Sequence, residues 1–375
     1  MRVVSSLNEI GQNRWDALVN AQQERTPFLS YGFLHALHES GSACAKTGWR
    51  PVYLTVWEHD NLLAALPLYE KSHSYGEYVF DWAWAEAYQR HGLNYYPKLV
   101  CAVPFTPVSG ARLLACNPQA RAILLQGLIE LQQGSAISST HILFPSTEEA
   151  QMLSEAGYLM RTGVQFHWLN QQYQDFEHFL SKLERKKRKN IRAERRKVRE
   201  AGVTFRHLDG EQILEADWIF FKRCYDHTYS DHYSSPYLNL DFFLRIGSGL
   251  PQHLHMIVAE QQGRPIAASL LVHGEGTVYG RYWGCVEHLP CLHFETAYYQ
   301  ALEFCIAAGM KVFEGGAQGE HKMARGFLPQ STYSAHWLAH PEFSDAVAQF
   351  LHREQDGIDN YISELKDRVP YRRGP

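Results

Sequence analysis

Cysteine is sparse in this sequence, and long hydrophobic runs are absent. The seven cysteines, at positions 44, 101, 116, 224, 285, 291 and 305, include no C-x-x-C pair, which argues against a disulfide framework and favours a reducing compartment. No apolar run approaches the roughly 20 residues that span a membrane, and the start, MRVVSSLNEIGQNRW, has no apolar signal-peptide core. We therefore expect a cytoplasmic protein.

Nucleotide-binding and nucleophile motifs are also missing. In EGGAQGEHKMARGF, residues 314–327, Lys322 follows His321 instead of a glycine, and Met323 stands where a P-loop has Ser or Thr. The hydroxyl that would hold Mg²⁺ is therefore absent. The glycines of this stretch are not followed by an amphipathic helix, which excludes the dinucleotide fingerprint, and no Ser-His-Asp nucleophile elbow is visible. What remains is a strand end and a polar turn, which either binds a ligand or is a solvated surface turn.

The composition is that of a compact soluble protein. The chain is 45% hydrophobic, 13% aromatic and 20% charged, which excludes extended disorder. Its 375 residues are too many for one ordinary core and suit two domains. We expect an N-terminal domain over residues 1–165 and a C-terminal domain over residues 166–375.

Positive charge is concentrated in one segment. Residues 182–199, KLERKKRKNIRAERRKVR, contain eleven Lys or Arg against two Glu, while the rest of the chain has 25 basic and 38 acidic residues, a net charge of −13. Leu183, Ile191 and Val198 recur at seven to eight residues, which predicts a helix with one thin apolar stripe. Its other faces are either solvated or a contact for RNA phosphates or an anionic membrane surface. The arginines of that contact would be Arg185, Arg188, Arg192, Arg195, Arg196 and Arg199, and we expect no DNA partner.

The two halves of the chain repeat weakly. PFLSYGFLHALHESG (27–41) resembles PYLNLDFFLRIGSG (236–249), and each is followed by two β-type runs around a polar turn, over residues 51–70 and 254–274. Both halves therefore predict a helix followed by an antiparallel hairpin. The second half continues as strand, helix and strand, in TVYGRYWGCV (277–286), HFETAYYQALEFCIAAG (293–309) and MKVFEGG (310–316). Gly309 is the expected helix terminator.

Helix, hairpin, strand, helix and strand in this order is the arrangement of the GNAT acetyltransferase fold, and two copies in tandem resemble the Fem family of peptidoglycan aminoacyltransferases. The resemblance is closest to FemAB-like bacterial proteins of the GNAT N-acyltransferase type, and it covers nearly the whole chain. The stretches that carry it are residues 71–88, 95–114, 185–202 and, most specifically, 293–329. The implied fold class is α/β (α+β), with two tandem GNAT-like domains, each a mixed, mainly antiparallel sheet flanked by helices.

The resemblance implies transfer of an acyl or aminoacyl group from an activated carrier to an amine, of a peptidoglycan precursor or a small metabolite, without a covalent enzyme intermediate. Such a transfer needs a base for the amine and stabilisation of the tetrahedral oxyanion. Glu314 at the strand end, with Glu320 and His321 in the turn, are the candidate catalytic residues. A carboxylate or imidazole there can take the proton of the amine directly or through a water.

Candidates for substrate binding lie in four places. Tyr279, Arg281 and Trp283 recur at period two and are expected to project from one face of their strand. The structural alternatives are surface pairing with Glu320 for the turn, a packed aromatic face for the strand and interdomain packing for the first-half stretch. The complete predicted set is Gln318, Lys322 and Arg325 in the turn; Tyr279, Arg281 and Trp283 on the strand; Glu295 at the helix start; and Glu77, Asp81 and Trp82 in the first-half stretch SYGEYVFDWAWAEAY.

The donor stays open between an acyl-CoA and an aminoacyl-tRNA. Acetyl-CoA enzymes of this fold hold the pyrophosphate at a Gly-rich turn before a helix. Here the connection CVEHLPCLHFE (285–295) has no glycine and places Glu287 and Glu295 beside the helix start, where carboxylates repel a phosphate. The aminoacyl-tRNA of Fem-like enzymes would give the basic segment a partner.

The same connection contains four residues that can ligate zinc. Cys285, His288, Cys291 and His293 lie within nine residues, which is tight for a tetrahedral site. We expect ordinary cysteines and histidines here and no metal.

A second hypothesis is a non-catalytic recognition protein with a degenerate GNAT fold. It would bind RNA, a cell-wall precursor or an anionic membrane surface through the basic segment and would consume no carrier.

Overall fold

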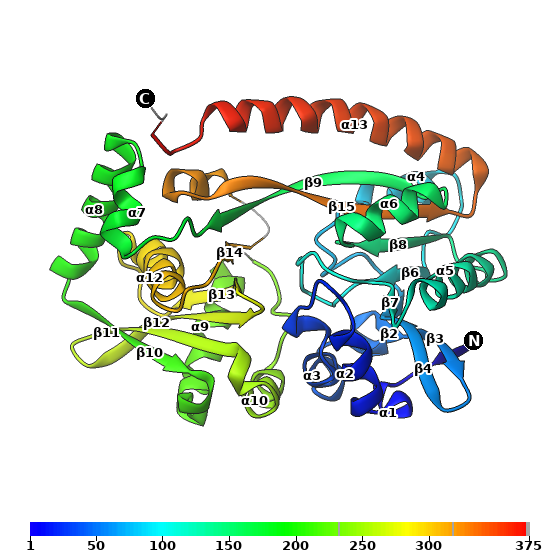
Figure 1. The fold of residues 1–375 in the computed structure, drawn as a ribbon, viewed down its shortest axis with the longest axis horizontal. Helices are drawn as coiled ribbons and strands as arrows, with labels where there is room; N and C mark the ends of the chain where they lie inside the picture. Colours follow the sequence, from blue (N-terminus) through cyan, green and yellow to red (C-terminus); the bar gives the residue numbers. More distant parts are fainter. Residues whose placement is uncertain (232, 317–318, 373–375) are drawn as a thin grey trace. The chain divides into compact units, whose positions relative to one another are not determined.

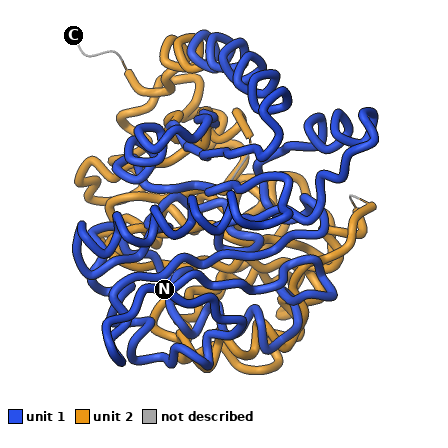
Figure 2. The backbone as a smooth tube through the Cα atoms, turned by 90° about the vertical axis from the view of Figure 1, so that its right-hand side faces the viewer, with its two compact units in different colours: residues 1–163, 331–361 blue, residues 164–330, 362–375 orange. Residues whose placement is uncertain are grey.

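The computed structural model describes residues 1–231, 233–316 and 319–372. It contains two compact units, each built from two separate segments of the chain (Figure 2). Unit 1 comprises Met1–Gly163 and Ser331–Tyr361, and unit 2 comprises Val164–Gln330 and the residues from Ile362 onward. The main division falls within two residues of the expected one, but residues 331–361, which we placed in the C-terminal domain, belong to unit 1. Local periodicity does not reveal which core a returning segment joins.

Unit 1 begins with a small antiparallel sheet in the order β1-β3-β4-β7, and its other strands pair in the order β2-β5-β6-β8. Only the β6–β8 pair of these is parallel. The elements are β1 (Arg2–Val4), α1 (Leu7–Ile10), α2 (Gln12–Asn20), α3 (Tyr31–Glu39), β2 (Trp49–Pro51), β3 (Tyr53–Glu58), β4 (Asn61–Leu66), β5 (Leu68–Lys71), α4 (Trp82–Arg90), β6 (Lys98–Cys101), β7 (Leu114–Ala115), α5 (Pro118–Gln133), β8 (Ser139–Leu143) and α6 (Thr147–Glu155).

Three elements have residues in both units. They are β9 (Leu159–Leu169), β15 (Leu328–Leu338) and the long helix α13 (Pro341–Asp367). Within unit 1, residues 334–338 of β15 pair antiparallel with β8. The core of unit 1 is aliphatic, because β3 and β4 bury Leu54 and Leu66 against Leu124 and Leu128 of α5.

Unit 2 contains the sheet β10-β11-β12-β13-β14, followed by the last residues of β9 (Figure 1). β10 to β13 are antiparallel neighbours, whereas β13 and β14 are parallel. The elements are α7 (Phe176–Lys182), α8 (Arg185–Glu200), β10 (Val203–Asp209), α9 (Glu215–Asp231), α10 (Leu240–Gly249), β11 (Leu254–Gln261), β12 (Arg264–Gly274), β13 (Thr277–Cys285), α11 (Leu292–Phe294), the π-helical turn η5 (Glu295–Tyr299), α12 (Gln300–Ala307), β14 (Val312–Glu314) and the 3₁₀ helix η6 (Glu320–Arg325).

The predicted fold class and element order are confirmed. In unit 2, α10 precedes the β11–β12 hairpin, and β13, α11 to α12 and β14 follow in the expected sequence. Gly309, with a φ of 64°, follows the end of α12, as expected of a helix terminator. The repeat is real as well, since α3 and the antiparallel β3–β4 hairpin of unit 1 correspond to α10 and β11–β12.

The basic segment is helical, with a later start than predicted. Ile191 and Val198 are buried in α8, which confirms the thin apolar stripe. Leu183 has extended backbone and forms a β-bridge with Tyr371, so α7 ends before it and α8 begins after it. Within the described residues, no helix is long and apolar enough to cross a bilayer.

Candidate active site

A largely buried carboxyl group, that of Glu314, lies at the end of β14. The strand register places Glu314 beside Tyr279 of β13 and beside His167 of β9. Its side chain is 15% exposed. Burial raises the pKa of Glu314 to about 8, and the neighbouring Arg281 opposes this rise. Among the described residues, no side chain donates a hydrogen bond to the carboxyl, and His167 Nε2 lies 3.9 Å from Glu314 Oε2. This carboxyl is therefore available as a proton acceptor.

His167 and Lys322, on the two segments that flank the end of β14, differ in charge. Burial, reinforced by Lys322, lowers the pKa of His167 to about 4, so its imidazole is neutral near pH 7. Lys322 of η6 is buried, and its Nζ donates to the carbonyl oxygen of Gly316 at 2.8 Å. Burial lowers the pKa of Lys322 to about 8. A Cβ at Gly315 would lie 2.9 Å from Phe327 and 3.3 Å from Lys322, so a side chain there would crowd the lysine.

Two other candidates of the turn lie on its outer side. Glu320 is about half exposed and pairs with Arg368 at 3.8 Å. His321 is exposed, and its Nε2 lies 3.3 Å from the hydroxyl of Tyr298. Partial burial and the adjacent Arg325 lower the pKa of His321. Gln318 lies outside the described residues. The side chain of Glu314 is therefore largely shielded from solvent, whereas those of the two other predicted catalytic residues, Glu320 and His321, are exposed.

Arg325 is an anchor within unit 2. Its guanidinium donates to both carboxylate oxygens of Glu194 in α8, at 3.0 and 3.1 Å, and to the His321 carbonyl at 2.8 Å. It lies 3.4 Å above the ring of Phe294, and only 5% of the residue is exposed. A guanidinium engaged on so many sides fixes η6 relative to α8.

Side chains of the π-helical turn η5 contact the same two elements, η6 and α8. Tyr298 faces His321, and the hydroxyl of Tyr299 donates to Glu194. Glu295 is buried and accepts from Arg195 of α8 and from Gln300 at 2.7 Å. Because Arg195 compensates its charge, Glu295 presents no free carboxylate at the helix start. Of the two carboxylates that were predicted to repel a phosphate at the helix start, Glu287 and Glu295, the second is therefore compensated by Arg195.

The predicted row on β13 is interrupted. The register with β12 shifts between Leu270 and Leu271, which leaves Arg281 as an extra residue between Gly280 and Tyr282. Such a bulge breaks the period-two alternation, so the expectation of one continuous face is corrected. The ring of Trp283 lies 4.5 Å from that of His293.

The chain matches the FemAB_like family, described as peptidoglycan biosynthesis/recognition, over residues 6–373. The chain belongs to this family. Among solved structures, FemX has a TM-score of 0.56 at 11% identity, with 92% of this chain and 99% of FemX covered. L-PGS from Bacillus licheniformis has a TM-score of 0.54 at 12% identity, with 91% of this chain and 97% of that one covered. At these identities the likeness concerns the fold. No curated protein matches the sequence.

In this FemAB_like chain, the predicted acids of the first half are buried. Glu77 and Asp81 are 4% and 2% exposed, and Lys98 Nζ binds both carboxylates, with 2.8 Å to Glu77. They therefore do not line a ligand cleft in this structure, because the lysine of β6 holds them inside unit 1. Trp82 is exposed, and its ring lies 4.9 Å from that of Tyr75.

Sequence reasoning missed three residues of this candidate site. His167 lies beside Glu314 only through strand pairing between positions far apart in the chain, and no local pattern marks it. Tyr299 belongs to the apolar helical pattern of residues 293–309, which gave no sign that its hydroxyl has a polar partner. Glu194 had a detectable signal, since it is an acid surrounded by basic residues in α8. An isolated charge of opposite sign in such a run indicates a specific partner.

The zinc-competent residues of the connection are dispersed. Cys285 Sγ lies 3.6 Å from His288 Nδ1, but His288 is exposed and pairs with Asp231, whereas His293 packs on Trp283. Within the described part of the chain, no group of three or more His, Cys, Asp or Glu residues could hold a metal ion.

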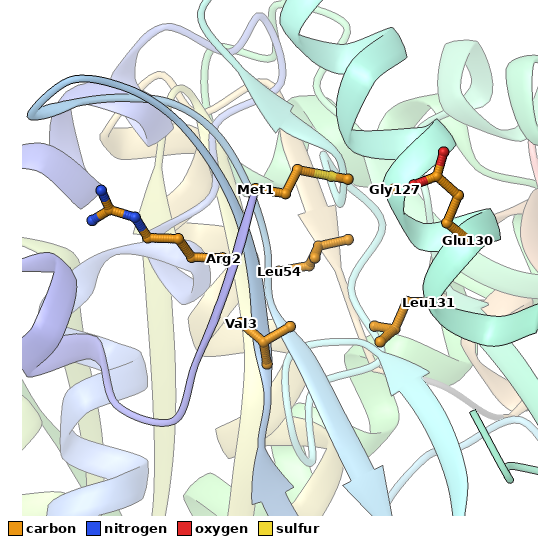
Figure 3. A pocket seen from close by; sticks show the side chains of 7 residues that line it. All are labelled: Met1, Arg2, Val3, Leu54, Gly127, Glu130 and Leu131. Carbon is orange, nitrogen blue, oxygen red and sulfur yellow. The ribbon is translucent and has the colours of Figure 1, made fainter. Parts of the chain in front are cut away.

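A separate pocket of about 230 Å³ in unit 1 contains none of the predicted site residues (Figure 3). Leu54 and Leu131 provide part of its apolar wall. Its lining is Met1, Arg2, Val3, Leu54, Gly127, Glu130 and Leu131.

Proposed function

We propose that this protein is an N-acyltransferase that moves an acyl or aminoacyl group from an activated carrier to an amine, with Glu314 as the general base. The observation that supports this most directly is the buried Glu314 carboxyl at the end of β14, whose pKa is raised to about 8 by burial. Membership of the FemAB_like family supports a peptidoglycan precursor as the acceptor.

The transfer requires few groups. The amine nitrogen attacks the carbonyl carbon of the donor, and its proton passes to the Glu314 carboxylate. The tetrahedral oxyanion then collapses, the carbonyl–oxygen bond of an ester donor or the carbonyl–sulfur bond of a thioester donor breaks, and the leaving group takes a proton. No covalent bond to the enzyme forms. The Lys322 ammonium, close to the end of β14, is placed to stabilise negative charge on the oxyanion.

The pKa of Glu314 suits this role. A general base is most effective when its pKa lies near the working pH, and an ordinary glutamate is too weak a base for an amine. Burial without a bound proton donor gives Glu314 a higher proton affinity. Glu320, exposed and paired with Arg368, lacks such an environment.

Arg325 and Arg195 have positioning roles in this proposal. Each is bound to carboxylates inside unit 2, so neither guanidinium is open to a substrate. They hold α8 against η6 and α12, and thereby fix the backbone that carries Lys322 beside the end of β14.

The donor is either an aminoacyl-tRNA or an acyl-CoA. The exposed cations of α8, such as Arg185 and Arg196, favour the tRNA because clustered cations release counterions from nucleic acid. The compensation of Glu295 by Arg195 removes part of the electrostatic argument against CoA.

Calorimetric titration of the purified chain with acetyl-CoA, CoA, charged tRNA and uncharged tRNA tests the donor. Binding of charged tRNA, with transfer of its aminoacyl group to a lipid-free peptidoglycan precursor, is the expected result. Micromolar binding of acetyl-CoA with acetyl transfer would assign the thioester donor instead. If no donor is consumed with any amine acceptor, the transferase proposal is wrong.

A second candidate function is recognition without catalysis. The family description includes recognition, and the exposed basic face of α8 would provide the contact. In that case the precursor or RNA binds, and substitution of Glu314 leaves all measured properties unchanged.

A further inference from the structure

A pocket of about 550 Å³ in unit 2 lies beside the basic helix α8. Residues of α7, α8 and β10 form its walls, together with the start of the π-helical turn and of α12. This volume lies within the range of small-molecule sites, about 300–1,000 Å³. The lining consists of Glu177, Leu180, Arg192, Arg195, Arg196, Val198, Arg199, Val203, Phe205, Glu295 and Gln300.

Positive charge dominates the polar side of this pocket, with four arginines against two glutamates. Arg195 is fixed, because it binds Glu295 and Glu303 and lies 4.6 Å above the ring of Phe176. It therefore contributes a wall and compensates the acid at the base of the pocket.

The other three arginines have weaker engagements. Arg192 pairs with Glu177, but both side chains are more than half exposed, and exposed pairs contribute little. Arg196 lies 3.8 Å from Glu200, and this pair is exposed too. Arg199 is exposed and has no ion pair among the described residues. Arg196 and Arg199 are thus available to an anion.

The pocket also has apolar lining residues. Leu180, Val198 and Val203 are buried, and Phe205 of β10 is partly exposed beside them. A partly exposed aromatic ring next to guanidinium groups provides a surface on which a planar or apolar group can pack. The lining of the pocket therefore combines cationic and apolar groups.

We propose that this pocket binds a small phosphate monoester whose organic part is apolar or aromatic. Arg196 and Arg199 bind the phosphate, which guanidinium groups recognise through paired hydrogen bonds, and Phe205 packs on the organic part. The enclosed size favours a small molecule over a polymer, whose backbone would also contact the cations outside the pocket, such as Arg185 and Lys186. This site does not include Glu314, and the inference does not depend on the proposed transfer.

The test is a calorimetric titration of the full chain with adenosine 5′-monophosphate, glycerol phosphate and inorganic phosphate at constant ionic strength. Two double variants of equal charge change are compared: Arg196→Gln with Arg199→Gln in the pocket, and Arg185→Gln with Lys186→Gln on the same helix outside it. All four side chains are exposed, so both variants are expected to fold, which circular dichroism checks.

We expect the nucleotide to bind more tightly than inorganic phosphate, and the pocket variant to weaken nucleotide binding by about tenfold or more. The outer variant should leave it within about twofold, since exposed charges act weakly at a distance. Arg199→Lys should give an intermediate loss, because the charge stays and the paired hydrogen bonds are lost. Tighter binding of glycerol phosphate than of the nucleotide would overturn the proposal, because it would show that the organic part does not pack on Phe205.

Equal losses in the two double variants would show a diffuse cationic surface and would overturn the proposal. So would binding of inorganic phosphate as tight as that of both esters, or no binding of any of the three compounds at millimolar concentration. These outcomes are independent of whether the chain transfers an acyl group, because no step of the test measures activity.

Discussion

Glu77 in unit 1 and Glu314 in unit 2 are both buried carboxyl groups with a raised pKa. Burial is the largest cause in each case, and it raises the pKa of Glu77 to about 7 and that of Glu314 to about 8. Each unit also contains a lysine whose pKa is lowered by burial, to about 7 for Lys71 and about 8 for Lys322. The pKa shifts alone would therefore not distinguish the Glu77 cluster of unit 1 from the Glu314 site of unit 2.

Their hydrogen bonds separate them. Lys98 Nζ donates to Glu77 and to Ser74, both at 2.8 Å, and also to Asp81, and its side chain is fully buried. These bonds fix the segment before α4 onto β6. Glu314 has no such donor among the described residues and keeps some exposure. The comparison teaches that a perturbed pKa marks a candidate active site only where the group is left without a fixed partner.

Removal of the Glu314 carboxylate should have the largest effect on function. Glu314→Gln keeps the size of the side chain and removes the proton acceptor, so kcat/KM for aminoacyl or acyl transfer should fall by about 10²- to 10⁴-fold. Steady-state transfer kinetics at pH 7.5 measure this. The matched control is Glu320→Gln on the exposed side of the turn, which should stay within about twofold. Equal losses in both variants would contradict the assignment of Glu314.

Removal of Lys98 should have the largest effect on stability. Lys98→Ala removes the cation that is hydrogen-bonded to both Glu77 and Asp81, and leaves only Lys71 at 4.0 Å from Glu77. This should cost about 3–5 kcal/mol of the free energy of unfolding. Lys322→Ala should cost only about 1–2 kcal/mol, since Lys322 donates to a carbonyl and has no ion pair with a carboxylate in the described part of the chain. Urea unfolding gives the two values, and hydrogen exchange in β6 and β8 should report the loss in unit 1 alone. Equal destabilisation by the two variants would refute the contrast.

The raised pKa of Glu314 also predicts a pH dependence of stability. The folded pKa of Glu314, about 8, lies above its ordinary value of 4.5, so its contribution to stability is present below pH 4.5 and is lost as the pH rises toward 8. Between pH 5 and pH 7.5 the wild type should therefore lose more stability than Glu314→Gln. Lys322 does not disturb this window, because its lowered pKa adds stability only as the pH rises above about 8. Parallel pH profiles of the two proteins would exclude the raised pKa.

Much of the fold could be predicted from the sequence because it is encoded locally. Alternation over a few residues indicated β13 and β14, helical periodicity with Gly309 indicated α12, and the spacing of Ile191 and Val198 indicated the buried stripe of α8. The family followed from the order of these elements. The segment of residues 331–361 was assigned to the wrong unit because its core contacts are with strands about 200 positions earlier, such as β8.

The site could be predicted only in part. The place of Glu314, at a strand end before a glycine-rich turn, was visible in the sequence, and so was the polarity of that turn. The environment of Glu314 could not be predicted from the sequence. His167 lies beside Glu314 only through strand pairing, and the bulge at Arg281 depends on the register with β12. The burial of Glu77 and Asp81 depends on Lys98 in a different strand. Partners brought together by tertiary structure have no local signature.

The division of each unit into two chain segments has a consequence for synthesis on the ribosome. Domains usually fold one after another as the chain emerges, the N-terminal one first. Unit 1 cannot follow this order, because His141 of β8 has its hydrogen-bond partner in His336, at 2.7 Å, and that residue is translated after nearly all of unit 2. Unit 2 has most of its residues available before unit 1 is complete. The first half of the nascent chain therefore stays without part of its core until residues 331–361 have been translated.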